Sequence, residues 1–132
     1  MRTSTAPRLL LADDDRVALD ACAAMLMLEG FDVHTAMDGY AALTAIQTWH
    51  PDIAMLDIEM PVMDGRTVAR NVRTMDSTRP TLLIALTALT SLADRLASIQ
   101  AGFNYHFTKP VQLDALLRTL DFHLDSSRRL HR

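Results

Sequence analysis

The chain has 132 residues, which fits one domain with a single core and excludes a catalytic domain joined to an accessory one. With a formal net charge of -3 it lacks the concentrated positive charge with which domains bind nucleic-acid phosphates, and its one cysteine, Cys22, excludes an internal disulfide framework. No apolar run approaches the ~20 residues that span a bilayer. We therefore expect a cytoplasmic protein that binds neither nucleic acid nor membrane directly.

Short apolar runs alternate along the chain with segments of helical composition. Turn residues and helix stops separate them, as at Gly30, Pro80 and Gly102. The predicted strands cover residues 8–12, 31–36, 53–56, 81–86 and 105–108. The predicted helices cover residues 16–29, 38–50, 64–75, 92–101 and 112–124.

This alternation predicts an α/β fold, because each helix then returns the chain to a parallel sheet that is covered on both faces. We expect a doubly wound, flavodoxin-like domain with five helices and the common strand order 2-1-3-4-5. We assign residues 8–125 to this domain, 1–7 to an N-terminal extension and 126–132 to a basic C-terminal tail.

Acidic residues directly follow two of the predicted strands. Asp13 and Asp14 follow the first strand, and Asp57 follows the third. With the expected strand order these carboxylates meet at the switch point, where open parallel sheets bind ligands. Carboxylates at close range repel one another unless a hard cation or a proton joins them, and Mg2+ suits oxygen ligands beside a phosphate. The pattern indicates a magnesium site at which Asp57 forms an aspartyl phosphate.

Two further side chains have places at the same edge of the sheet. Thr87 follows the fourth strand and offers a hydroxyl, and Lys109 follows the fifth and offers a cation. Each also has a purely structural interpretation, because a threonine can bond nearby backbone groups and a lone lysine is usually solvated. Asp13 or Asp14 can likewise be a helix N-cap, although three consecutive acids exceed what capping needs.

Four separated motifs, spread over about Arg8 to Leu124, resemble the receiver domain of two-component response regulators. They are Asp13-Asp14, Asp57 with Met60-Pro61-Val62-Met63-Asp64-Gly65, Thr87-Ala88 and Lys109-Pro110. The resemblance implies that Asp57 accepts a phosphoryl group from a phosphohistidine. It implies that Asp13, Asp14, Asp57 and the backbone carbonyl of Glu59 hold Mg2+, that Thr87 and Lys109 contact the phosphoryl group, and that the bond before Pro110 is cis.

Some positions depart from the common pattern of that family. The switch residue three positions before Lys109 is often Tyr or Phe, and here it is His106. Glu59 and Leu89 lie where the family tunes loss of the phosphoryl group. We expect them to hinder the attacking water and to slow autodephosphorylation.

The resemblance also implies partners. A histidine kinase or a histidine phosphotransfer domain is the implied phosphodonor, and a downstream effector or a second copy of the chain would receive the signal. Several apolar residues of the first helix, Leu19 and Met27 among them, suggest a docking surface for that donor, although stray apolar residues explain them equally well.

Two other function classes remain open from the sequence. One is a magnesium-dependent phosphatase with a nucleophilic aspartate, like the haloacid dehalogenase-like family, although Pro61 stands where that family has Thr. The other is a receiver-like interaction module that is never phosphorylated. We favour the phosphoacceptor switch, which is not an enzyme, because it accounts for all of the motifs.

Overall fold

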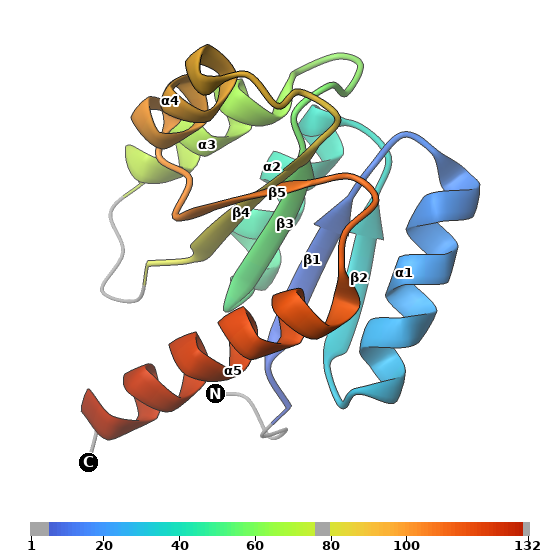
Figure 1. Ribbon diagram of the computed structural model, residues 1–132, viewed down its shortest axis with the longest axis vertical. Helices are drawn as coiled ribbons and strands as arrows, with labels where there is room; N and C mark the ends of the chain where they lie inside the picture. Colours follow the sequence, from blue (N-terminus) through green and yellow to red (C-terminus); the bar gives the residue numbers. More distant parts are fainter. Residues whose placement is uncertain (1–5, 76–79, 131–132) are drawn as a thin grey trace.

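Five strands alternate with five helices in the computed structural model, which describes residues 6–75 and 80–130 (Figure 1). The strands are β1 (Arg8–Ala12), β2 (Asp32–Ala36), β3 (Ile53–Asp57), β4 (Leu82–Thr87) and β5 (Tyr105–Thr108). The helices are α1 (Arg16–Leu28), α2 (Gly39–Trp49), α3 (Gly65–Arg73), α4 (Leu92–Ala101) and α5 (Leu113–Leu130). The predicted elements are thus present, and their ends differ by at most two residues except at the end of α5.

The strands form one parallel sheet in the order β2-β1-β3-β4-β5. Leu9 pairs with both Val33 and Ile53, Ile53 pairs with Leu82, and Ile84 pairs with Tyr105. The five strands therefore stay in register and end at a common edge. We call this the carboxyl edge of the sheet and the opposite one the amino edge. The expected doubly wound fold with strand order 2-1-3-4-5 is confirmed.

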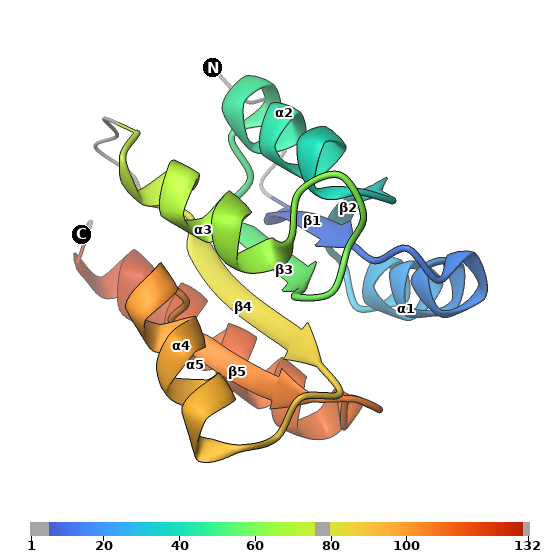
Figure 2. The same cartoon turned by 90° about the horizontal axis from the view of Figure 1, so that it is seen from above.

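Helices cover both faces of the sheet, with α1 and α5 on one face and α2, α3 and α4 on the other (Figure 2). Side chains alternate between the faces along each strand. In β3, Ile53 and Met55 pack on the side of α1 and α5, whereas Ala54 and Leu56 pack on the side of the other three helices. Because β3 is buried on both faces, its sequence is continuously apolar until Asp57.

Side-chain caps start four of the helices at the carboxyl edge. Asp15, Asp38, Asp64 and Ser91 each accept a hydrogen bond from a backbone N–H in the first turn of α1, α2, α3 and α4. These bonds satisfy donors that a helix leaves open at its start. The third acid after β1 is therefore a cap, and Asp13 and Asp14 remain for other roles.

Two expectations about the helices were wrong. Leu19 is only 2% exposed and packs in the core with Ala23 and Leu26, so it cannot belong to a docking surface. Helix α5 continues to Leu130, into the segment that we assigned to a tail. The predicted helix ended too early because the polar residues that follow Leu124 show no apolar stripe. Within the described residues, no helix combines the length and apolar character that a membrane span requires.

Candidate functional site at the carboxyl edge

Three carboxylates meet where β1 and β3 end. Ala12 pairs with Leu56 in the sheet, so Asp13 and Asp57 leave neighbouring strands side by side. Asp13 and Asp57 are buried and Asp14 is exposed, and one oxygen from each lies within 4.8 Å of the others. The predicted convergence of these residues is confirmed.

Lys109 joins the two buried carboxylates. Its Nζ donates to Asp13 Oδ2 at 2.8 Å and to Asp57 Oδ2 at 3.0 Å. The Lys109 backbone N–H donates to Thr87 O at 2.9 Å, and the peptide bond to Pro110 is cis, as expected. One ammonium group therefore faces three carboxylates, which leaves the site with excess negative charge.

The ionisation of Asp57 reflects this balance. Burial raises the pKa of Asp57, and the nearby Asp13 charge adds to the rise, whereas Lys109 and the Glu59 backbone N–H work to lower it. Burial works to lower the pKa of Lys109, but its bonds to Asp13 and Asp57 outweigh burial and raise it. Lys109 thus stays cationic, and the buried Asp57 charge is only partly compensated. An additional cation would stabilise the ionised carboxylates.

The chemistry of the donor set fits a magnesium ion. Asp13, Asp14 and Asp57 offer oxygen ligands only, with the exposed Asp14 on the solvent side, and Mg2+ prefers such ligands together with water. The Glu59 side chain is exposed and is not part of the cluster found among the described residues, but its backbone N–H donates to Asp57 Oδ1 at 3.1 Å. Both oxygens of Asp57 are therefore held in defined positions.

Thr87 and His106 lie on the β4 and β5 side of the site. Thr87 is fully buried at the end of β4, and its Oγ1 accepts from the Leu89 N–H at 3.0 Å. His106 is half-buried, with Nε2 at 3.2 Å from Leu89 O and Nδ1 at 3.3 Å from Ser98 Oγ. The His106 ring therefore points inward between β5 and α4.

Two glycines that carry no chemistry shape the loop between β3 and α3. A Cβ on Gly65 would lie 2.5 Å from Asp57 O, and one on Gly39 would collide with the Met63 carbonyl oxygen. The sequence analysis placed Asp38-Gly39 and Asp64-Gly65 at the starts of two predicted helices. The structure adds that this loop packs closely on Asp57 and on the first residue of α2.

Val62 in the same loop has a strained backbone. Its φ is +72°, although the side chain is β-branched and 81% exposed. Such residues are rare in the left-handed region, because Cβ crowds the backbone there. Strain is thus stored in the loop that follows Asp57.

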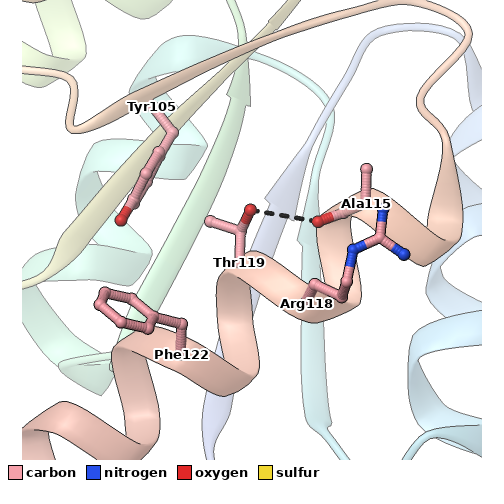
Figure 3. Close-up of a pocket in the computed structure, with 5 residues that line it drawn as sticks. All are labelled: Tyr105, Ala115, Arg118, Thr119 and Phe122. Carbon is pink, nitrogen blue, oxygen red and sulfur yellow. Dashed lines mark hydrogen bonds between the residues drawn. The ribbon is translucent and has the colours of Figure 1, made fainter.

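A separate, shallow pocket, open to solvent, lies between β5 and α5, apart from the acidic cluster. It measures about 420 Å3 and is lined by Tyr105, Ala115, Arg118, Thr119 and Phe122. Figure 3 shows these side chains and the hydrogen bond from the Thr119 hydroxyl to the Ala115 carbonyl. Arg118 is the one charged residue in its lining, so the cavity offers no acid for metal or phosphoryl chemistry.

The comparisons with known proteins agree with this geometry. The family model described as "Response regulator receiver domain" matches residues 9–121. The transcriptional regulatory protein PrrA of Mycobacterium tuberculosis is 41% identical over 113 residues, which cover 86% of this chain and 48% of that protein. The response regulator MprA of Mycobacterium avium is 37% identical over 83% of this chain and 47% of its own length. The chain thus spans about half the length of these curated relatives.

Solved structures resemble the whole domain. The receiver domain of Francisella response regulator 1452 has a TM-score of 0.84 and 28% identity over 92% of this chain and 98% of its own. The receiver domain of the sensor histidine kinase PA1611 from Pseudomonas aeruginosa has a TM-score of 0.80 and 32% identity, covering 88% of this chain and 95% of its own. The second structure is described as having a magnesium ion coordinated in its active-site cleft.

Proposed function

Because the chain belongs to the response regulator receiver family, a family of signalling modules, we propose that Asp57 is its phosphoacceptor. The observation that carries this proposal is the buried Asp57 carboxylate, hydrogen-bonded to Lys109 at 3.0 Å and grouped with Asp13 and Asp14. A buried, incompletely compensated carboxylate at the carboxyl edge of a parallel sheet is suited to nucleophilic chemistry.

The proposed reaction transfers a phosphoryl group from the imidazole of a phosphohistidine. An Asp57 carboxylate oxygen forms a bond to phosphorus while the P–N bond breaks, and the electron pair returns to the donor imidazole. In this proposal Lys109 pairs with the phosphoryl oxygens and Thr87 bonds one of them. The contact of Lys109 with Asp57 supports the first of these roles.

Mg2+ is the proposed cofactor, held by Asp13, Asp14, Asp57 and the backbone carbonyl of Glu59. When bound, it would offset the negative charge of the incoming phosphoryl group. The three clustered carboxylates support this proposal, as does the magnesium ion described for the PA1611 receiver domain.

We propose a histidine kinase or a histidine phosphotransfer domain as the donor. Exposed apolar residues on α1 support a docking surface there, with Val17, Met25, Met27 and Leu28 between 44% and 88% exposed. Unlike Leu19, these side chains are available to a partner. A downstream effector, or a second copy of the chain, remains the proposed recipient of the signal, and we propose a cytoplasmic location for this exchange.

Phosphorylation of the purified chain tests the function. With acetyl phosphate and Mg2+, intact-mass spectrometry should show the addition of one phosphoryl group, which chelation of the metal should prevent. Asp57→Asn should abolish the labelling, because the amide oxygen is a poor nucleophile. Asp64→Asn is the matched control, because Asp64 is an exposed cap of α3 and asparagine caps equally well. Labelling of the Asp57→Asn protein at wild-type level would refute the proposal.

A further inference from the structure

A second pocket lies between the end of α1 and helix α5, at the amino edge of the sheet. It measures about 210 Å3, and its apolar lining includes Phe31, Leu117 and Leu124, which pack on the core. Its two acidic residues, Glu29 and Asp121, are exposed, and its lining includes no lysine or arginine. The pocket thus combines apolar surface with negative charge that no neighbour in the lining offsets.

The two acids of this pocket have no partner inside the described part of the chain. Within residues 6–75 and 80–125, neither the Glu29 nor the Asp121 carboxylate takes part in a hydrogen bond or an ion pair. Charged groups at an interface are usually matched by opposite charges on the partner. The pocket therefore fits a segment that brings a cation together with apolar surface.

One face of α5 carries the pocket residues and then a basic residue. Leu117, Asp121 and Leu124 line the pocket, and position 128, an arginine, continues the same helical spacing within α5. Asp121 and Arg128 are about 10 Å apart along the axis, whereas residues that pair on a helix are three or four positions apart. The end of α5 extends past the amino edge of the sheet (Figure 1). Another molecule can therefore approach this part of the helix.

This row of residues is complementary to itself. If a second α5 lies antiparallel with the midpoint beside Leu124, Asp121 of each copy faces Arg128 of the other. The two leucines at position 124 then meet at the centre of the contact. Glu29 adds a second carboxylate at the same pocket for the incoming arginine. Such a contact is isologous, which is the commonest arrangement in homodimers.

We propose that two copies of the chain associate through this face of α5, with Arg128 of each copy at the acidic pocket of the other. The contact lies at the amino edge, so it leaves the carboxyl edge with Asp57 open to a phosphodonor. It goes beyond the proposed phosphoryl transfer and does not depend on it. Because the contact is small and its charges are exposed, we expect a dissociation constant on the order of 100 µM.

Sedimentation of the full chain at roughly 10 µM to 1 mM tests the association. The wild type should change from monomer to dimer, and added salt should weaken the dimer because it screens exposed charges. Asp121→Lys and Arg128→Glu should each raise the dissociation constant about tenfold or more, because each places like charges opposite one another. Asp114→Lys, at an exposed position two turns before Asp121, is the matched control and should dimerise as the wild type does.

Mixing the two charge-reversal variants gives a sharper result. An Asp121→Lys copy and an Arg128→Glu copy have opposite charges at both ends of an isologous contact, although each variant repels its own kind. The mixture should therefore form heterodimers at concentrations at which neither variant dimerises alone. Mixing would not restore association if either substitution had simply unfolded the protein.

Cross-linking tests where the twofold axis lies. Cys22 is the only cysteine, so a Cys22→Ser background is free of thiols. In that background, Leu124→Cys should give a disulfide-linked dimer on mild oxidation, because the two copies of position 124 meet. Asp114→Cys is the control and should stay monomeric, since position 114 is about 15 Å from position 124 along the helix.

Three results would each overturn the proposal. They are a wild type that stays monomeric over the whole range, a dimer that neither the charge reversals nor their mixture changes, and a Leu124→Cys protein that forms no linked dimer. Labelling by acetyl phosphate should persist in all of the charge variants, because none of them alters the carboxyl edge. Failure of the dimer and failure of the proposed function are therefore seen separately.

Discussion

The two ends of α4 are fastened in different ways. At the amino edge of the sheet, Arg73 at the end of α3 donates to Gly102 O at 2.9 Å, Thr81 O at 2.9 Å and Asn104 Oδ1 at 2.7 Å. At the carboxyl edge, the loop before α4 depends on single hydrogen bonds in series through Leu89. Several hydrogen bonds from one planar, charged guanidinium group hold neighbouring segments together even if one of them is lost. A series of single hydrogen bonds is interrupted when any one of them breaks. The end of α4 at the amino edge is thus held by more direct hydrogen bonds than the loop before α4.

Arg73→Ala should have the largest effect on stability. It removes three hydrogen bonds that join α3 to the segments before β4 and β5, and we expect the free energy of unfolding to fall by about 2 kcal/mol. Urea denaturation measures this loss, and labelling by acetyl phosphate should persist in the folded protein. Arg70→Ala, which removes an arginine that is also exposed on the same helix, is the control and should be nearly neutral. An Arg73→Ala protein as stable as the control would mean that the amino edge is not an anchor.

Asp57→Asn should change stability in the opposite direction. Because burial raises the pKa of Asp57, the folded state binds its proton more tightly than the unfolded state does. Stability is therefore lost as the pH rises through the raised pKa, and above it the buried charge costs free energy. Asn removes that cost, so we expect a gain on the order of 1 kcal/mol near neutral pH that disappears in acid. Thermal unfolding of both proteins across pH measures it, and a gain independent of pH would contradict the assignment.

Val62→Gly should stabilise the domain by up to about 1 kcal/mol, because glycine adopts a positive φ without the strain of a β-branched residue. The flexibility of glycine in the unfolded chain offsets part of this gain. Chemical denaturation measures the difference. Val62→Ala separates the two causes, since alanine keeps a Cβ and should gain less. Equal stability of all three proteins would mean that the loop stores no strain.

Glu59→Asn should leave stability almost unchanged, because the side chain is exposed. We expect it to shorten the lifetime of the phosphorylated protein by opening a path for water to Asp57. The decay of the phosphorylated mass over time checks this. Leu89→Ala is a poorer test, since Leu89 packs on the core and its backbone is hydrogen-bonded to Thr87 and His106. An unchanged lifetime in Glu59→Asn would remove the hypothesis.

The strands and the acidic cluster could be predicted because local signals determine them. The apolar run before Asp57 ends in a carboxylate, and the same pattern at Asp13 places both residues at one edge once the strands are parallel. The burial of Leu19 could also have been predicted, since Leu19, Ala23 and Leu26 have helical spacing. The interpretation of α1 as a broad apolar surface ignored that stripe.

Hydrogen bonds between distant segments could not be predicted in this way. The partners of Arg73 lie 8 to 31 residues further along the chain, and nothing in its local sequence separates it from Arg70, which is exposed as well. Likewise, the motif identified His106 as a switch position, but only the packing of α4 on β5 brings Ser98 Oγ to 3.3 Å from His106 Nδ1. These contacts depend on where side chains end in three dimensions, and hydrophobic periodicity carries no such information.

Gly39 shows how a position without chemistry limits variation around the site. Its backbone fits against the Met63 carbonyl oxygen, so α2, at the outer part of the sheet, supports the loop that covers Asp57. In a library of random substitutions, position 39 should accept almost nothing but glycine, as strictly as a functional residue would. That intolerance would reflect steric crowding between the start of α2 and the loop after β3. A search for functional residues that relied on mutational tolerance alone would select position 39 by mistake.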